Sequence, residues 1–218
     1  MITTDSDLQG RVLSELKWEP SIDSAEVGVT ADDHVVTLRG NVATYTQKVA
    51  AARAARRVFG VQGVANEIKV APTGTHGGSD SDIADAAVHA LRWSAVVPNG
   101  AAKVTVSNGF VTLDGSVEWQ FERRAAELAV RDIRGVVGVS NLIKLAPRAS
   151  AKDVKVKIEG AFQRNAVIDA RRIVVEEAGG KIVLRGTVHS LAERAEAEHA
   201  AWAAPGVSHV DNRLAVSA

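Results

Sequence analysis

Cysteine is absent from this chain of 218 residues. Its absence excludes a disulfide framework, a thiolate metal site and a thiol nucleophile. Excess charge of either sign is also absent, because 26 Lys and Arg balance 26 Asp and Glu. Without a net positive field to attract a polyanion, we expect no nucleic-acid partner. No apolar run approaches the roughly 18 residues of a membrane span, so we expect no transmembrane segment.

Residues 1–10 contain neither a basic start nor the apolar stretch of a secretory signal. We therefore expect a cytoplasmic protein, or a periplasmic one if the sequence is a processed form.

Signatures of catalysis and of metal binding are missing as well. Histidines occur singly, without an i, i+4 pair on a helix or a carboxylate at metal-ligand spacing, at positions 34, 76, 89, 189, 199 and 209. No Gly-x-Ser-x-Gly elbow and no Walker loop is present. The sequence thus predicts a protein that is not an enzyme, with no catalytic residues, no metal site and no cofactor.

What the chain does contain is one segment repeated three times. Leu-x-Gly recurs with its glycine at Gly40, Gly115 and Gly186. The same offsets relate three Gly-Val pairs, which begin at Gly60, Gly135 and Gly206. A period of this length is too long for a solenoid unit and suits a small domain. We predict three tandem domains, at residues 1–71, 79–146 and 150–218.

Each repeat has the same pattern of periodicities. A capped helix with apolar residues at i, i+4 and i+8 comes first, followed by two alternating strands joined by a short turn. A second, alanine-rich helix and a final alternating strand complete the repeat. The order α-β-β-α-β predicts an α+β fold, in which a three-stranded mixed sheet carries both helices on one face.

The recurrent glycines are predicted to be structural. Those at positions 40, 115 and 186 lie on the inward side of a strand, where glycine usually marks a close approach or a bulge, and we attribute them to the closely packed second helix. Those at positions 60, 135 and 206 are interpreted as stopping that helix in the manner of a C′ glycine. Gly60-Val61-Gln62-Gly63 also has the spacing of the nucleotide-clamping loop of KH domains, but a strand follows it here, which favours the helix-stop turn.

The Leu-x-Gly-x-Val strand, the alanine-rich helix and the exit Gly-Val-x-x-Val-x-Asn-x-[Ile/Leu] together resemble the BON domain family, named for OsmY and nodulation proteins. The match covers nearly the whole chain, as a tandem triple-BON, OsmY-like arrangement. The resemblance implies a non-catalytic binding or scaffold module that is associated with osmotic or envelope stress and with phospholipid surfaces. OsmY-like relatives are mostly periplasmic.

Local charge suggests where a lipid surface would bind. The second helix of the first repeat carries cations and no acid, and the first helix of the third repeat is basic too. The candidate contacts with an anionic phospholipid surface are Lys48, Arg53, Arg56, Arg57, Lys152, Lys155 and Lys157. Two alternatives stay open, namely solvated helix faces and attraction between basic and acidic helices of different repeats or chains, as in a homo-oligomer or a complex with a protein partner.

Two tryptophans occupy the same position after the first helix, Trp18 in the first repeat and Trp93 in the second. We expect them to cover a small core. The alternative is that they are exposed and enter a lipid interface beside the basic residues.

Overall fold

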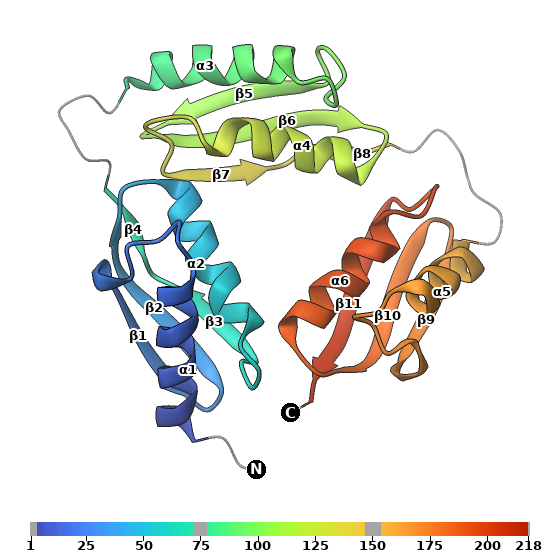
Figure 1. Cartoon of the computed structure of the whole chain (residues 1–218). Coiled ribbons are helices and arrows are strands. Elements are labelled where there is room, and N and C mark those ends of the chain that lie inside the picture. Colours follow the sequence, from blue (N-terminus) through green and yellow to red (C-terminus); the bar gives the residue numbers. More distant parts are fainter. Residues whose placement is uncertain (1–3, 72–77, 147–153, 218) are drawn as a thin grey trace.

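The computed structural model of the chain describes residues 4–71, 78–146 and 154–217. These ranges form three units, each with its own sheet and its own hydrophobic core (Figure 1). We call them the first, second and third unit. The α+β fold with repeated helix and strand order is confirmed.

The first unit contains α1 (Asp5–Trp18), η1 (Ser24–Glu26), β1 (Val27–Asp32), β2 (Val35–Val42), α2 (Tyr45–Arg57), β3 (Gly63–Asn66) and β4 (Lys69–Val70). The second contains α3 (Asp80–Trp93), β5 (Ala102–Ser107), β6 (Phe110–Val117), α4 (Gln120–Arg131), β7 (Gly138–Asn141) and β8 (Lys144–Leu145). The third contains α5 (Val154–Arg164), η2 (Ala170–Arg172), β9 (Ile173–Ala178), β10 (Lys181–Val188), α6 (Leu191–Trp202) and β11 (His209–Val216).

Each sheet is built around its second strand. In the first unit β2 pairs antiparallel with β1 and parallel with β3 and β4. Leu38 lies opposite Asn66 and Asn41 opposite Lys69, so β3 and β4 are one strand, in one register, with a short interruption. In the third unit the corresponding strand, β11, is continuous and pairs with β10 over eight residues. The predicted three-stranded mixed sheet is therefore present in every unit.

Both helices of a unit cover the same face of its sheet. Strand residues that alternate inward, such as Val36, Leu38 and Val42, share a core with the buried stripe of α1. That stripe is the predicted one, and its counterparts in α3 and α5 are buried too: Leu8, Val12 and Leu16; Ile83, Ala87 and Leu91; Val154, Ile158 and Phe162. Small alanines on α2 let its backbone lie close to the strands, as the periodicity predicts.

The hairpins are closed by two-residue turns in which both residues have positive φ. These residues are Asp33 and His34, Asn108 and Gly109, and Gly179 and Gly180. This conformation matches the right-handed twist of the flanking strands. In the first unit the turn comes later than the Ala31-Asp32-Asp33 stretch would place it, because Asp32 still pairs with Val35.

The strand glycines Gly40, Gly115 and Gly186 lie against backbone atoms at the start of the first strand, and not against the second helix. A Cβ atom on Gly40 would lie 1.9 Å from the carbonyl oxygen of Glu26, just before β1, and Gly115 and Gly186 have the same relation to Ala101 and Arg172. All three have φ between 127° and 140°. The close approach is thus to the chain entering the first strand, and not to the second helix as the sequence suggests.

Gly60, Gly135 and Gly206 lie a few residues beyond the end of the second helix of their units. α2 ends at Arg57, and Gly60 (φ 94°) is the third residue of a turn in which the Val61 amide donates to the Val58 carbonyl. Gly135 and Gly206 occupy equivalent turns with φ of 93° and 86°. The predicted C′ position is displaced, since the chain makes a separate turn toward the last strand.

The three units are arranged in a ring around their second helices (Figure 1). α2 contacts α6, and the side chain of Leu191 at the start of α6 packs against the core of the first unit. Tyr45 at the start of α2 packs against the core of the second unit. The start of α4 and the end of α6 line a common cavity. Each second helix therefore meets the next one head to tail.

Candidate functional site

The basic residues of α2 divide into free and engaged ones. Arg53 and Arg56 are exposed and have no ion pair or hydrogen bond within the described ranges. Lys48 is half-buried. Arg57 contacts two carboxylates of the same unit, Glu15 at 2.9 Å and Glu19 at 3.3 Å. Arg57 is thereby committed to joining α2 to α1, and only Arg53 and Arg56 are available to a ligand without breaking a contact.

The Arg57 contact also changes the acidity of its partner. A hydrogen bond from Ser21 and another from Arg57 hold the pKa of Glu19 below its ordinary value. Hydrogen bonds to the carboxylates of Glu15 and Glu19 raise the pKa of Arg57 above its usual value. At neutral pH the two groups are therefore an ion pair that stabilises the helix pair, not an anion-binding site.

The basic residues of the third unit lie elsewhere. Lys155 is exposed and lies 3.7 Å from Glu159 one turn along α5, and Lys157 is exposed on the same helix. Lys152 lies outside the described residues. Because α6 is the helix of the third unit that contacts α2, the basic residues of α5 and α2 do not form one continuous patch (Figure 1).

Both predicted core tryptophans are exposed instead. Trp18 is 82% and Trp93 84% exposed, each at the last residue of its helix. The expectation that they cover a core is wrong, because the buried stripe ends at Leu16 and Leu91 and the final residue of each helix turns outward. Each of the two units therefore leaves one large aromatic ring in contact with water.

Sequence reasoning missed the role of the asparagines in the exit strand. Each donates from its side-chain amide to a backbone carbonyl of the second helix and accepts from the amide two residues further on. Asn66 contacts Lys48 and Ile68; Asn141 contacts Arg123 and Ile143; Asn212 contacts Arg194 and Leu214. Their recurrence at fixed offsets was the available signal. These residues hold the last strand to the helix and are not ligand contacts.

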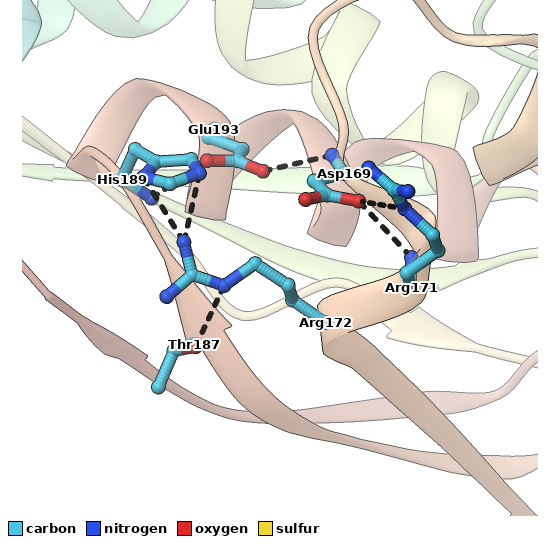
Figure 2. A network of polar contacts seen from close by, with 6 residues as sticks. All are labelled: Asp169, Arg171, Arg172, Thr187, His189 and Glu193. Carbon is cyan, nitrogen blue, oxygen red and sulfur yellow. Dashed lines mark hydrogen bonds and ion pairs between the residues drawn. The ribbon is translucent and has the colours of Figure 1, made fainter.

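Glu193 is a buried residue in the first turn of α6, and Figure 2 shows the polar network around it. Glu193 is 3% exposed and accepts hydrogen bonds from the backbone amides of His189 (2.7 Å) and Asp169 (3.0 Å). Partial desolvation opposes ionisation of Asp169, but hydrogen bonds from Arg171 hold its pKa below the ordinary value. Arg172 contacts the His189 ring and donates to Thr187. Since every oxygen of Glu193 is used on backbone amides, the network stabilises the helix start.

A cavity lies between the second and the third unit. It has a volume of about 440 Å³ and lies between the start of α4 and the end of α6. Its lining combines Trp119, Phe121 and Trp202 with Arg124, Glu198 and His199. None of these residues was singled out as a site by the sequence, because only the packing of the second unit against the third brings them together.

In residues 4–71, 78–146 and 154–217, no group of three or more His, Asp or Glu side chains is placed to hold a metal ion. Of the helices found there, none has the length and apolar character needed to cross a bilayer.

Comparison with known proteins points to one family. A family model described as "BON domain" matches residues 4–72, 79–147 and 150–218. Osmotically-inducible protein Y of Escherichia coli (strain K12) is 31% identical over 144 residues, which cover 64% of this chain and 72% of that protein. Two structures of CdsD, described as a structural protein of the type III secretion system of Chlamydia trachomatis, align with 97% of this chain and 92% and 98% of theirs, at 13% identity and TM-scores of 0.27 and 0.26. Scores this low support no conclusion about this chain.

Proposed function

The chain belongs to the BON domain family, and from this we propose that it is a non-catalytic binding and scaffold protein of the osmotic or envelope stress response that associates with anionic phospholipid surfaces. The link to stress comes from similarity to an osmotically inducible protein. The observation that supports lipid association is the exposure of Trp18 and Trp93 at matching places in two units.

Tryptophan favours the boundary between water and lipid, since its ring is apolar and its indole N–H is polar. Leaving two such rings in water forgoes their burial, whereas a bilayer surface would accept them. Arg53 and Arg56 add unpaired positive charge on α2. Near an anionic surface each such charge contributes about 1 kcal/mol. Lys48, Lys155 and Lys157 are proposed as further contacts, and Arg57 would have to leave Glu15 and Glu19 to take part.

Co-flotation with phospholipid vesicles tests this proposal. We expect the protein to float with anionic vesicles at low salt and to be released at roughly 0.5 M salt, where the Debye length is only a few ångströms. Replacing both arginines (R53E/R56E) should abolish flotation, and W18A/W93A should weaken it. The matched control K103E/K144E changes the net charge equally at exposed positions of the second unit and should float normally. Equal flotation of all four proteins, or none for the parent, refutes lipid association.

The second candidate is a protein-interaction module that forms an oligomer or holds a protein partner without lipid. It is favoured by apolar side chains exposed on the third unit, where Val156, Val167 and Val174 are all more than half exposed. If this function is the right one, light scattering after size exclusion gives a mass above the 23.0 kDa of one chain, and V156S/V174S returns it to one chain. A monomer at every concentration leaves a different protein as the partner to be sought.

The compartment is proposed as cytoplasmic, or periplasmic for a processed form. Fractionation of cells that produce the untagged protein separates the two, because the periplasmic contents alone are released by osmotic shock.

A further inference from the structure

The three junctions of the ring are built from equivalent positions with different chemistry. Tyr45, Gln120 and Leu191 each begin a second helix. Tyr45 and Leu191 pack as apolar groups against the core of a neighbouring unit. At the junction of α4 and α6 the position is the polar Gln120, and a cavity lies there.

Gln120 lines the cavity of about 440 Å³, which is larger than the cavity of about 290 Å³ at the junction of α2 and α4. A cavity of this volume suits a small organic ligand. Its walls are formed by aromatic rings, with the Trp119 and Phe121 rings stacked at 6.1 Å between centroids and Trp202 on the α6 side. Phe121 is 58% exposed, which is a large apolar surface left open at the entrance. Aromatic walls of this kind favour a flat, apolar ligand.

The polar groups of the cavity define the rest of the ligand. Arg124 donates to Nδ1 of His199 over 3.1 Å and has no carboxylate partner among the described residues. Its remaining N–H groups can therefore bind an anion in a forked geometry. Glu198 is the one acid in the lining, and its carboxylate accepts from Asn212 of β11 at 3.0 Å.

We propose that this cavity binds a small aromatic carboxylate. The ring lies between the side chains of Trp119, Phe121 and Trp202, and the carboxylate binds Arg124. Because the ligand contacts both α4 and α6, its binding also holds the second unit to the third.

Indole-3-acetate is a suitable probe, since it has a flat ring and a carboxylate. Its indole ring absorbs and fluoresces in the same range as tryptophan, so its binding is measured by isothermal titration calorimetry. We expect saturable binding at one site when the probe is titrated to about 10 mM, a range that detects Kd values near 1 mM.

A variant tests the predicted ion pair, with affinities measured by calorimetry. R124M should weaken indole-3-acetate about tenfold and leave the neutral indole-3-acetamide unchanged, because a charge-assisted hydrogen bond is lost. R11M is the control, since it loses the same charge at an exposed position of α1 outside the cavity.

Circular dichroism spectra of all variants check that they are folded. Absence of saturable binding to the parent overturns the proposal, as does an affinity that R124M lowers no more than R11M does. Vesicle flotation does not depend on this cavity and is expected to be the same for R124M and the parent.

Discussion

Certain polar side chains recur in the repeat because they form hydrogen bonds with backbone groups that helices and strands leave unpaired. Asn66 joins the last strand to α2 through one donor and one acceptor, and its counterparts do the same in the other units. Asp80 accepts from the amides of Asn108 (2.7 Å) and Gly109 (2.9 Å), which ties the start of α3 to the hairpin turn. Asp5 accepts from the Asp33 amide in the first unit at 3.3 Å. Polar side chains of this kind fix the connections between elements.

Gly115 offers the sharpest test at this scale. Its φ is 140°, and a Cβ atom would lie 2.0 Å from the carbonyl oxygen of Ala101. Because that obstacle is backbone, we expect Gly115→Ala to lower the free energy of unfolding by about 3 kcal/mol or more. Chemical denaturation measures the change.

Gly10 provides the control for Gly115. It lies within α1, and a Cβ atom added there would meet nothing within 4 Å. Gly10→Ala should raise stability by up to about 1 kcal/mol, the difference in helix propensity. Similar stability changes for the two variants would contradict the close approach at Gly115.

At the scale of elements, helix starts are the parts most sensitive to chemistry. Ser79 caps the start of α3, and its hydroxyl (2.8 Å) and backbone amide (2.9 Å) both donate to the carboxylate of Asp82. At the start of α4, the corresponding cap position is Trp119, which has no hydroxyl group. There the Glu122 carboxylate accepts hydrogen bonds from the backbone amides of Glu118 and Trp119. α4 therefore starts without a side-chain cap, which leaves the Trp119 ring free to line the cavity.

The cap of α3 predicts a pH dependence. The hydroxyl and the amide of Ser79 hold the pKa of Asp82 below its ordinary value. A carboxyl group with a lowered folded-state pKa stabilises the fold above its unfolded pKa of about 4, and this stabilisation is lost as the pH falls through the folded pKa. Ser79→Ala should raise the Asp82 pKa, so its deficit in stability relative to the parent should be larger at pH 7 than at pH 3.

NMR titration of the Asp82 carboxyl carbon measures the pKa, and urea unfolding at the two pH values measures the deficit. An Asp82 pKa that Ser79→Ala leaves unchanged would show that the hydrogen bonds from Ser79 do not govern it. The exposed Ser116→Ala variant of the second unit serves as the control and should change neither quantity.

At the scale of the whole molecule, three small cores depend on one another through the ring of second helices. A unit of about 70 residues has only a marginal hydrophobic core. Tyr45 of the first unit packs against the core of the second, and Leu191 of the third unit packs against the core of the first. These contacts bury apolar surface that a unit on its own would expose to water. The Thr46 hydroxyl donates to Asp132 across the first of these junctions. The described ion pairs all lie within single units, so the ring is held by packing and hydrogen bonds.

Leu191 tests the ring without harming the helix that carries it. Leu191→Glu places an acid in the first turn of α6, where the helix dipole favours it, but removes an apolar contact worth about 1–2 kcal/mol. We expect a larger radius of gyration by small-angle X-ray scattering and an unchanged helix content. Val156→Glu, on the exposed face of α5, should alter neither quantity. An unchanged radius for Leu191→Glu would show that this contact does not hold the ring.

Much of each unit was predictable because its signals are local. The stripe of Leu8, Val12 and Leu16 and the alternation along β2 specify helix, strand and inward face through periods of 3.6 and 2. The predictions for Gly40 and Trp18 were less accurate. Periodicity does not identify which backbone atoms lie against Gly40. It also does not show whether Trp18, the last residue of its helix, points toward the core or toward water.

The candidate sites show the same division. The cations of α2 could be read from the sequence, but the pairing of Arg57 with Glu15 and Glu19 could not, since these residues are about 40 positions apart. The cavity lined by Trp119 and Trp202 left no signal in the sequence at all, because its walls come from different repeats.

The repeat, the order of elements, the composition of each core and the family can all be inferred from the amino-acid sequence. These properties follow from patterns within about 70 residues, in which side-chain periodicity and turn residues act on their own segment. The folded arrangement, in contrast, sets which cations are free, which tryptophans are exposed and where a cavity opens. Those properties depend on how surfaces of separate units meet, and packing between surfaces is set by the shape and charge of residues far apart along the chain.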